Sequence, residues 1–153
     1  MLLTFAACDD RDGRGTLQVM PTINRVLLDS IETYRGVGID DRHLDAHGLY
    51  IVKVRPAGET LLFALEAICP HGRGHRVRFD DMTGRFRCMG DSHRFTREGL
   101  PAERDYQGKA LARIAVAVVD GRLAIYPEQR YYFEKQEWSA PRSMVVLPPA
   151  DEE

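Results

Sequence analysis

Short apolar and β-branched runs, separated by turn residues, make up the middle of the chain. Residues 49–54 (LYIVKV) and 61–65 (LLFAL) lie on either side of a Pro-Ala-Gly-Glu turn at 56–59, which predicts a β-hairpin. Residues 76–79 (RVRF) alternate polar and apolar positions, and the extended pattern resumes at 85–87 after a turn-forming break. Since alternation with a period of two is typical of half-buried strands, the body of the chain is predicted to be antiparallel β.

The Asp-Gly pair at 120–121 is the strongest turn signal in the sequence. It separates the apolar run 114–119 (IAVAVV) from 122–126 (RLAIY). Both central positions of a two-residue hairpin turn need a positive φ, which Gly adopts freely and Asp tolerates. This pair therefore predicts a second hairpin near the end of the domain.

One N-terminal segment has a helical pattern instead. Asn24 is a suitable N-cap, residues 25–34 would form the helix, and Gly36 would end it. A single short helix is therefore predicted ahead of the strands.

Composition is that of an ordinary globular domain. Of the 153 residues, 44% are hydrophobic and 29% are charged, which excludes a mostly disordered chain. The net charge of −2 gives no general electrostatic case for binding nucleic acid. No run approaches the roughly 18–20 apolar residues that span a bilayer. Three cysteines do not make a disulfide framework.

The chain divides into three predicted zones. Residues 1–21 are an N-terminal anchor or linker segment, residues 22–126 are the folded domain, and residues 127–153 are a C-terminal extension. The extension begins with an aromatic patch of Tyr131, Tyr132, Phe133 and Trp138. Because such aromatic residues need to be covered, the chain is expected to be a subunit of a larger assembly.

Two short segments of the domain carry residues that bind metals. Cys69 and His71 flank a proline directly after a predicted strand, and sixteen residues separate His71 from Cys88. Asp91 and His93 follow Cys88 closely. Thiolate suits iron–sulfur clusters and zinc, and imidazole suits several transition metals. The two segments therefore predict one metal centre built from two loops.

In this region the sequence resembles the Rieske iron–sulfur family. That family has Cys-x-His, a spacer of about sixteen residues and Cys-x-x-His, with two cysteines on one iron and two histidines on the other. The resemblance runs from about residue 49 to residue 126. It includes the apolar strand before Cys69, the Gly-Arg-Phe-Arg approach to Cys88, Arg94-Phe95, Gly-Leu-Pro at 99–101 and the hairpin at 120–121. It implies an all-β fold, a Rieske-like antiparallel β-sandwich with a small two-loop cluster-binding subdomain, and a [2Fe–2S] cluster as cofactor.

The second loop departs from the family pattern at the last ligand. Counted without a gap, Asp91 occupies the position of the family's second histidine, and Phe95 and Gly99 fall where the family has them. If the loop bulges by two residues, His93 supplies the nitrogen instead. The downstream match favours Asp91, and both residues remain alternatives. A third alternative is that the fourth ligand is lost and the domain holds no cluster.

Positions around the ligands also bear on the site. Many Rieske proteins have a disulfide between the two loops, and the matching positions here are Gly74 and Gly90, as in the family's disulfide-free ferredoxins. High-potential members have Ser and Tyr where this chain has His93 and Phe95, and those hydroxyls stabilise the reduced cluster. His75 could line the rim of the first loop, but an exposed loop histidine is the favoured interpretation.

Seven arginines cluster in the sequence around the predicted site. They form either a solvated face of alternating strands or a basic rim that docks an acidic redox partner. The seven are Arg73, Arg76, Arg78, Arg85, Arg87, Arg94 and Arg97.

The N-terminal run Phe-Ala-Ala-Cys-Asp-Asp resembles a bacterial lipoprotein cleavage box, with Cys8 as the lipidated residue. Only seven residues precede Cys8, without a basic segment, whereas a signal peptide needs roughly 15–30 residues. The alternative is a short hydrophobic segment that packs on a partner. A lipidated Cys8 predicts a membrane-associated lipoprotein at the periplasmic face of the bacterial inner membrane, and an unmodified one predicts a cytoplasmic protein.

Together these features predict an electron-transfer subunit that carries a Rieske-type [2Fe–2S] cluster and passes single electrons between redox protein partners, in a membrane-associated complex. Cys69 and Cys88 would hold one iron, and His71 with Asp91 or His93 would hold the other. Since no nucleophile–base pair is evident, the chain is expected to be a component of an oxidoreductase complex rather than a stand-alone enzyme. The competing hypothesis is a Rieske-like structural subunit that has lost its cluster, and a single zinc ion ranks third.

Overall fold

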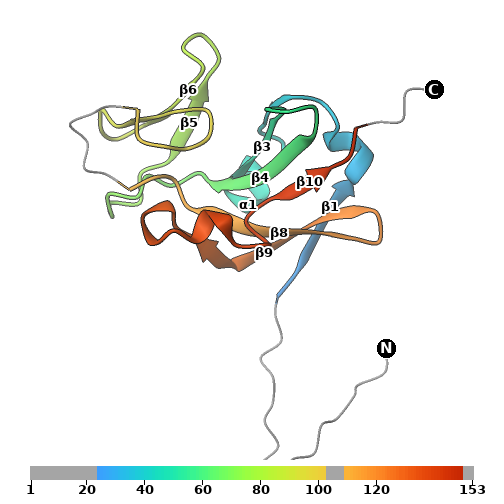
Figure 1. The fold of residues 1–153 in the computed structure, drawn as a ribbon. Coiled ribbons are helices and arrows are strands. Elements are labelled where there is room, and N and C mark those ends of the chain that lie inside the picture. Colours follow the sequence, from blue (N-terminus) through green and yellow to red (C-terminus); the bar gives the residue numbers. More distant parts are fainter. Residues whose placement is uncertain (1–23, 103–108, 150–153) are drawn as a thin grey trace, which may run out of the picture.

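The computed structural model describes residues 24–102 and 109–149, whose strands form two antiparallel sheets (Figure 1). The larger sheet has the order β1-β9-β8-β4-β3-β2, with β10 paired to β4, and the smaller has the order β5-β6-β7. The strands are β1 (Val26–Ser30), β2 (Gly38–Asp40), β3 (Leu49–Val54), β4 (Thr60–Glu66), β5 (Val77–Asp80), β6 (Arg85–Cys88), β7 (Arg94–Phe95), β8 (Arg113–Val119), β9 (Arg122–Tyr131) and β10 (Val145–Leu147). The remaining elements are the one-turn helix α1 (Leu44–His47) and the 3-10 segments η1 (Ile31–Tyr34), η2 (Phe133–Lys135) and η3 (Glu137–Ser139). The predicted all-β antiparallel class is confirmed.

Both predicted hairpins are present. β3 and β4 pair along their length, from Leu49 opposite Glu66 to Val54 opposite Leu61. β8 and β9 meet at Asp120 and Gly121, whose φ angles of 50° and 71° are those of a turn that needs a positive φ at both positions. The Asp-Gly pair therefore predicts the turn between β8 and β9 correctly.

The predicted helix over residues 25–34 is wrong. β1 occupies the first half of this segment, and η1 follows it. β1 lies at the edge of the larger sheet, where Val26 pairs with Ile125 and Leu28 is 5% exposed among the core residues. Pairing with β9, which is remote in the sequence, overrides a local pattern that suits a helix.

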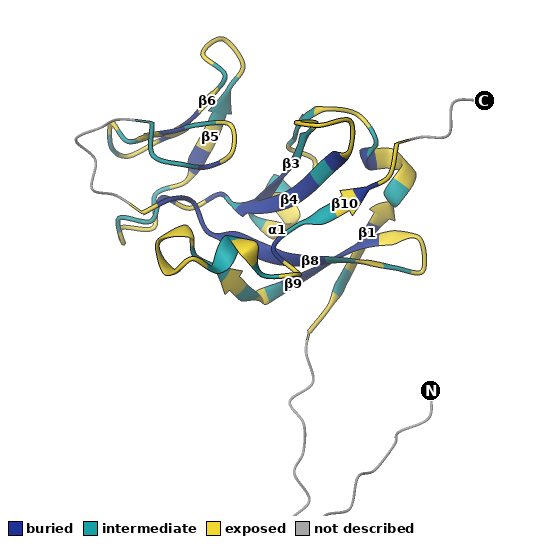
Figure 2. Cartoon of the chain, in the orientation of Figure 1, coloured by how far each residue is buried: buried dark blue, intermediate teal, exposed yellow. Residues whose placement is uncertain are grey.

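β3 and β4 are buried on both faces, and they separate two apolar cores (Figure 2). Ile51 and Leu62 face the core formed with β1, β8 and β9. The second core lies between β3–β4 and the small sheet. It comprises Tyr50, Val52, Phe63, Leu65, Ala67, Cys69, Val77, Phe86, Cys88, Phe95 and Leu111. Both cysteines of the predicted metal centre therefore belong to this second core.

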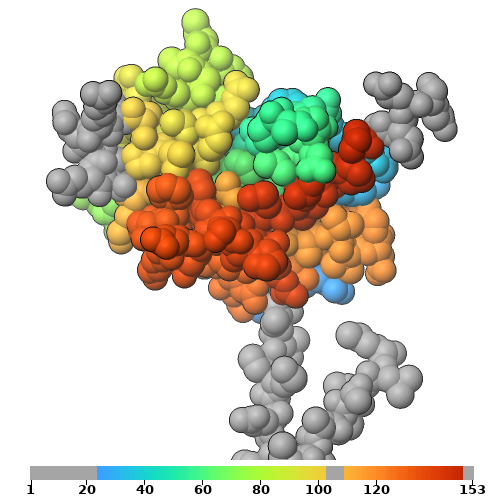
Figure 3. All heavy atoms as spheres, viewed as in Figure 1, coloured from blue at the N-terminus to red at the C-terminus, as the bar shows by residue number. Residues whose placement is uncertain are grey.

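The segment after β9 returns to the larger sheet. η2 and η3 lead to β10, whose Val146 pairs with Leu61 of β4. In Figure 3 this segment, coloured orange to red, covers part of the face in view. The guanidinium of Arg113 on β8 lies between two rings, 4.0 Å from the centroid of Phe63 and 4.1 Å from that of Trp138. This stack joins the segment to the sheet.

Candidate metal centre

Two loops at the end of the second core carry the predicted ligands. The first loop connects β4 to β5 and is closed by a hydrogen bond from the Cys69 N–H to the His75 carbonyl, at 2.8 Å. The second loop connects β6 to β7 and is closed in the same way, from the Cys88 N–H to the His93 carbonyl, at 2.9 Å. Val77 pairs with Cys88, which holds the loops side by side.

The two thiols are buried where the loops leave the core. Cys69 is 1% exposed and Cys88 is 2% exposed, and both are free cysteines. Burial raises the pKa of the Cys69 thiol to about 12, and the adjacent Cys88 thiol contributes to this rise. Since metals bind the thiolate, a bound cation is needed to deprotonate such a buried thiol at neutral pH.

His71 bridges the two loops. Its Nδ1 atom lies 2.5 Å from Cys69 Sγ, and its Nε2 atom lies 2.5 Å from Asp91 Oδ2. His71 thus places one ring nitrogen beside a thiol of its own loop and the other beside a carboxylate of the second loop.

Both candidates for the fourth ligand lie at the site. The donor atoms of His71, His75, Cys88 and Asp91 all lie within 4.8 Å of one another, and those of Cys69, His71 and His93 do as well. The His93 ring stands edge-on to His71, with ring centroids 4.9 Å apart, and its Nδ1 atom is 3.6 Å from Cys69 Sγ. The choice between Asp91 and His93 therefore stays open.

His75 is not the exposed loop histidine that the sequence favoured. Its side chain is 35% exposed, and its Nδ1 atom lies 3.2 Å from His71 Nε2 and 3.5 Å from Asp91 Oδ2. A Cβ atom at Gly90 would lie 1.9 Å from His75 Nδ1, so the second loop has room for this ring only because residue 90 is glycine. Gly90 is the sequence signal for this space, whereas a Cβ at Gly74 would meet nothing within 4 Å.

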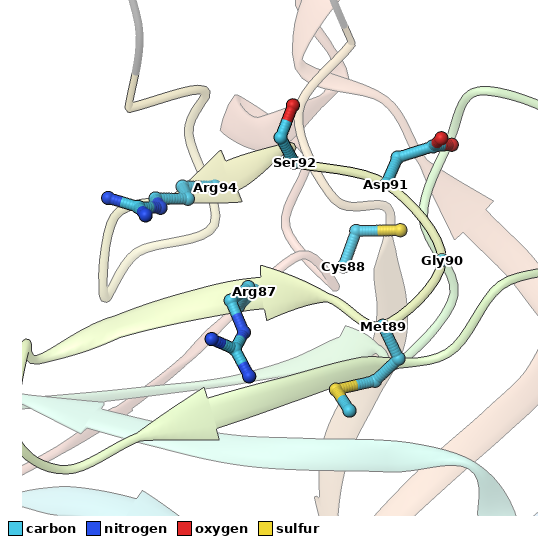
Figure 4. Close-up of a pocket in the computed structure, with 7 residues that line it drawn as sticks. All are labelled: Arg87, Cys88, Met89, Gly90, Asp91, Ser92 and Arg94. Atoms are coloured by element: carbon cyan, nitrogen blue, oxygen red, sulfur yellow. The ribbon is translucent and has the colours of Figure 1, made fainter.

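The second loop also borders an open cavity of about 410 Å³ (Figure 4). Figure 4 shows Arg87 and Arg94 on one side of the loop and Asp91 on the other. The cavity is lined by Arg87, Cys88, Met89, Gly90, Asp91, Ser92 and Arg94.

These donors fit a [2Fe–2S] cluster. Two buried, free thiols would supply the sulfur ligands of one iron, and His71 with an oxygen or a second nitrogen would supply those of the other. A carboxylate from Asp91 is harder than imidazole and anionic, so it would favour the oxidised cluster.

The predicted lipidation site, Cys8, lies outside the described residues. Among residues 24–102 and 109–149, no helix has the length and apolar character needed to cross a membrane.

Among solved structures, the chain is similar to a crystal structure of the cyanobacterial plasma membrane Rieske protein PetC3 from Synechocystis PCC 6803. The two are 17% identical, the match covers 65% of this chain and 97% of that one, and the TM-score is 0.39. No protein-family model matches the chain, and no match to a curated protein is found.

Proposed function

We propose that this chain holds a [2Fe–2S] cluster between its two loops and passes single electrons between redox protein partners. The observation that carries the proposal is the convergence of two buried free thiols, Cys69 and Cys88, with the imidazole of His71 from hydrogen-bonded loops. A thiol pair and an imidazole in one small site match the mixed sulfur and nitrogen ligation that the sequence resemblance implies.

The proposed ligands differ in how deeply their side chains are buried. Cys69 and Cys88, at the end of the core, hold the inner iron, and His71 with a fourth residue holds the outer iron near the surface. The cluster supplies reversible one-electron chemistry when it is bound. The closed loops keep the thiols away from water, and the partly exposed side chains of His71 and Asp91 leave one side open to a partner.

We propose Asp91 as the fourth ligand, with His93 as the alternative. The ungapped spacing from Cys88 supports Asp91, as does its contact with His71 Nε2. The contact between His93 Nδ1 and Cys69 Sγ supports the alternative.

Iron and acid-labile sulfide per chain, measured on anaerobically purified protein, test the cluster. We expect two of each, and an electron paramagnetic resonance signal of the reduced protein with the low average g-value of nitrogen-ligated centres. Colourless protein without iron would favour the structural subunit instead. Zinc in place of iron would support a single-metal site.

The fourth ligand is tested by two matched variants. With histidine labelled by ¹⁵N, pulsed resonance spectra of the reduced cluster should show one coordinated histidine nitrogen if Asp91 is the ligand and two if His93 is. Asp91→Ala should then lose the cluster, whereas His93→Ala should retain it. An intact cluster in Asp91→Ala with two coordinated nitrogens would assign the role to His93.

Attachment to the membrane is a separate proposal. The residues around Cys8 support acylation of its thiol in a bacterial host, which would place the chain at the periplasmic face of the inner membrane. Intact mass spectrometry of protein from its native source measures this, and an unmodified chain that still carries Met1 would exclude lipidation.

A further inference from the structure

Three arginines stand directly opposite one another across the small sheet. Arg78 on β5 pairs with Arg87 on β6, and Arg87 pairs with Arg94 on β7. Directly opposed residues project from the same face of a sheet, with Cβ atoms about 4.5–5.5 Å apart. All three arginines are exposed, whereas Val77 and Phe86, which alternate with them, are fully buried on the other face. This row is named the arginine ladder below.

Like charges directly opposite each other destabilise a sheet, so the ladder calls for a compensating anion. Within the described ranges, no carboxylate forms an ion pair with a ladder guanidinium. The backbone N–H of Met82 binds the Asp80 carboxylate at 3.0 Å and, with a weaker effect of Arg87, lowers the pKa of that carboxyl. Asp91 pairs with His71. Among the described residues, no carboxylate therefore lies within 4.0 Å of a ladder guanidinium, and Asp41 and Asp81 line a pocket with Arg78 only.

The ladder borders the metal centre. Arg87 and Arg94 line the cavity of about 410 Å³ whose other walls include Cys88 and Asp91 (Figure 4). Met89, in the same wall, is 51% exposed. Arginine and methionine are enriched at protein–protein interfaces, where they provide charge pairing and adaptable apolar contact.

We propose that the arginine ladder docks an acidic protein surface, whose carboxylates pair with Arg87 and Arg94 at the mouth of this cavity. Charge complementarity specifies the partner, because planar guanidinium groups suit bidentate binding of carboxylates. A nucleic acid is disfavoured, since the chain as a whole has a net charge of −2 rather than an extended basic surface. The docking is inferred from the arginine ladder alone. Electron exchange with the docked partner, in contrast, rests on the proposed function.

Binding of a fluorescein-labelled deca-glutamate peptide, followed by fluorescence anisotropy at low and at physiological salt, tests the docking. We expect binding that weakens with salt and that weakens about tenfold in Arg87→Gln/Arg94→Gln at low salt. The control Arg25→Gln/Arg55→Gln removes the same charge from exposed positions of the larger sheet, before β1 and after β3, and should change the affinity less than about twofold. Because the peptide needs no cluster, this result is independent of the iron content of the protein.

Several results would overturn the proposal. Equal losses in both double variants would show a general charge effect, tighter binding of duplex DNA would favour nucleic acid, and competition by inorganic phosphate as effective as that by unlabelled peptide would indicate a small-anion site. The stability of the ladder variant distinguishes a docking role of the arginines from a structural role. The urea midpoint of Arg87→Gln/Arg94→Gln should equal or exceed that of the unaltered protein, and a lower midpoint would make the ladder a structural feature.

Discussion

At the scale of single residues, the metal centre depends on a position that has no side chain. Gly90 faces the His75 ring so closely that an added Cβ would lie 1.9 Å from Nδ1 and 2.2 Å from Cε1. The ring in turn touches His71 and Asp91. Because Gly90 has no side chain, the His75 ring of the first loop can pack against the second loop.

Gly90→Ala should move His75 and lower the free energy of unfolding by about 1–3 kcal/mol, because overpacking forces side chains or backbone to shift. Gly36→Ala is the matched control, since nothing lies within 4 Å of a Cβ at that position. Urea unfolding measures both. His75→Ala combined with Gly90→Ala should recover most of the loss, and additive losses would contradict the contact.

Phe95 bears on the reduction potential of the proposed cluster. High-potential members of the Rieske family have a hydroxyl where this chain has Phe95, which is fully buried and cannot donate a hydrogen bond. We expect a potential in the lower half of the range of about −150 to +300 mV, or below it, by protein-film voltammetry. Phe95→Tyr should raise the potential, whereas Phe79→Tyr, which adds a hydroxyl elsewhere on the small sheet, should not. A value near the upper end for the unaltered protein would contradict the expectation.

At the scale of elements, the sequence predicts those connections whose geometry depends on a few neighbouring residues. The two hairpins follow from alternation and from the positive φ required at 120–121, both of which are visible in a few neighbouring residues. The strand β1 could not be predicted, because its partner β9 is distant in sequence and only the folded sheet offers that edge. The spacing of Cys69, His71 and Cys88 predicts that they meet, and their side chains do lie at one site. The place of His75, in contrast, depends on how the first loop closes. The fourth ligand stays open for a similar reason, since both candidates reach one small space.

Arg113 links β8 to the C-terminal segment by stacking rather than by ion pairing. It is 6% exposed, and its Nε and Nη1 atoms are buried without a hydrogen-bond partner among the described residues. Burial lowers the pKa of this guanidinium to about 10, because desolvation disfavours the charge. The rings of Phe63 and Trp138, on its two faces, offset that cost.

Arg113→Lys should lower the free energy of unfolding by about 1–2 kcal/mol, because lysine keeps the charge but loses the planar stack. Arg113→Met keeps the volume without the charge and should change it by less than about 1 kcal/mol. Trp138 is the only tryptophan, so its fluorescence during urea unfolding reports on this segment directly. Equal losses in the two variants would contradict this account, because they would show that a buried lysine charge costs no more here than an uncharged methionine.

At the scale of the whole molecule, a second polar cluster lies outside the two ligand loops. His43 at the start of α1 places Nε2 2.8 Å from the hydroxyl of Tyr34, which is completely buried. Burial raises the pKa of Tyr34 to about 12, so the hydroxyl stays protonated at neutral pH and can donate to Asp29 Oδ2. Asp29 lies 3.4 Å from that hydroxyl and 3.8 Å from His43 Nε2. The cluster joins β1, η1 and α1.

This cluster should make the fold sensitive to mild acid. Desolvation lowers the pKa of His43 below its ordinary 6.5, and nearby Arg42 acts in the same direction, against the opposing charges of Asp40 and Asp29. Between the folded and unfolded pKa values, the unfolded chain binds the extra proton, so stability rises with pH through this window and is lost as pH falls below about 6.5. The urea midpoint should therefore fall between neutral pH and pH of about 5.

His43→Gln removes the titrating group, and its midpoint should fall less over the same range. The ring of His47, 6.2 Å from that of His43, also lowers the pKa of His43, so His47→Gln should weaken the slope only slightly. The histidines of the metal centre are present in all three proteins, so the difference between the curves isolates His43, and parallel curves for His43→Gln and the unaltered protein would contradict this account.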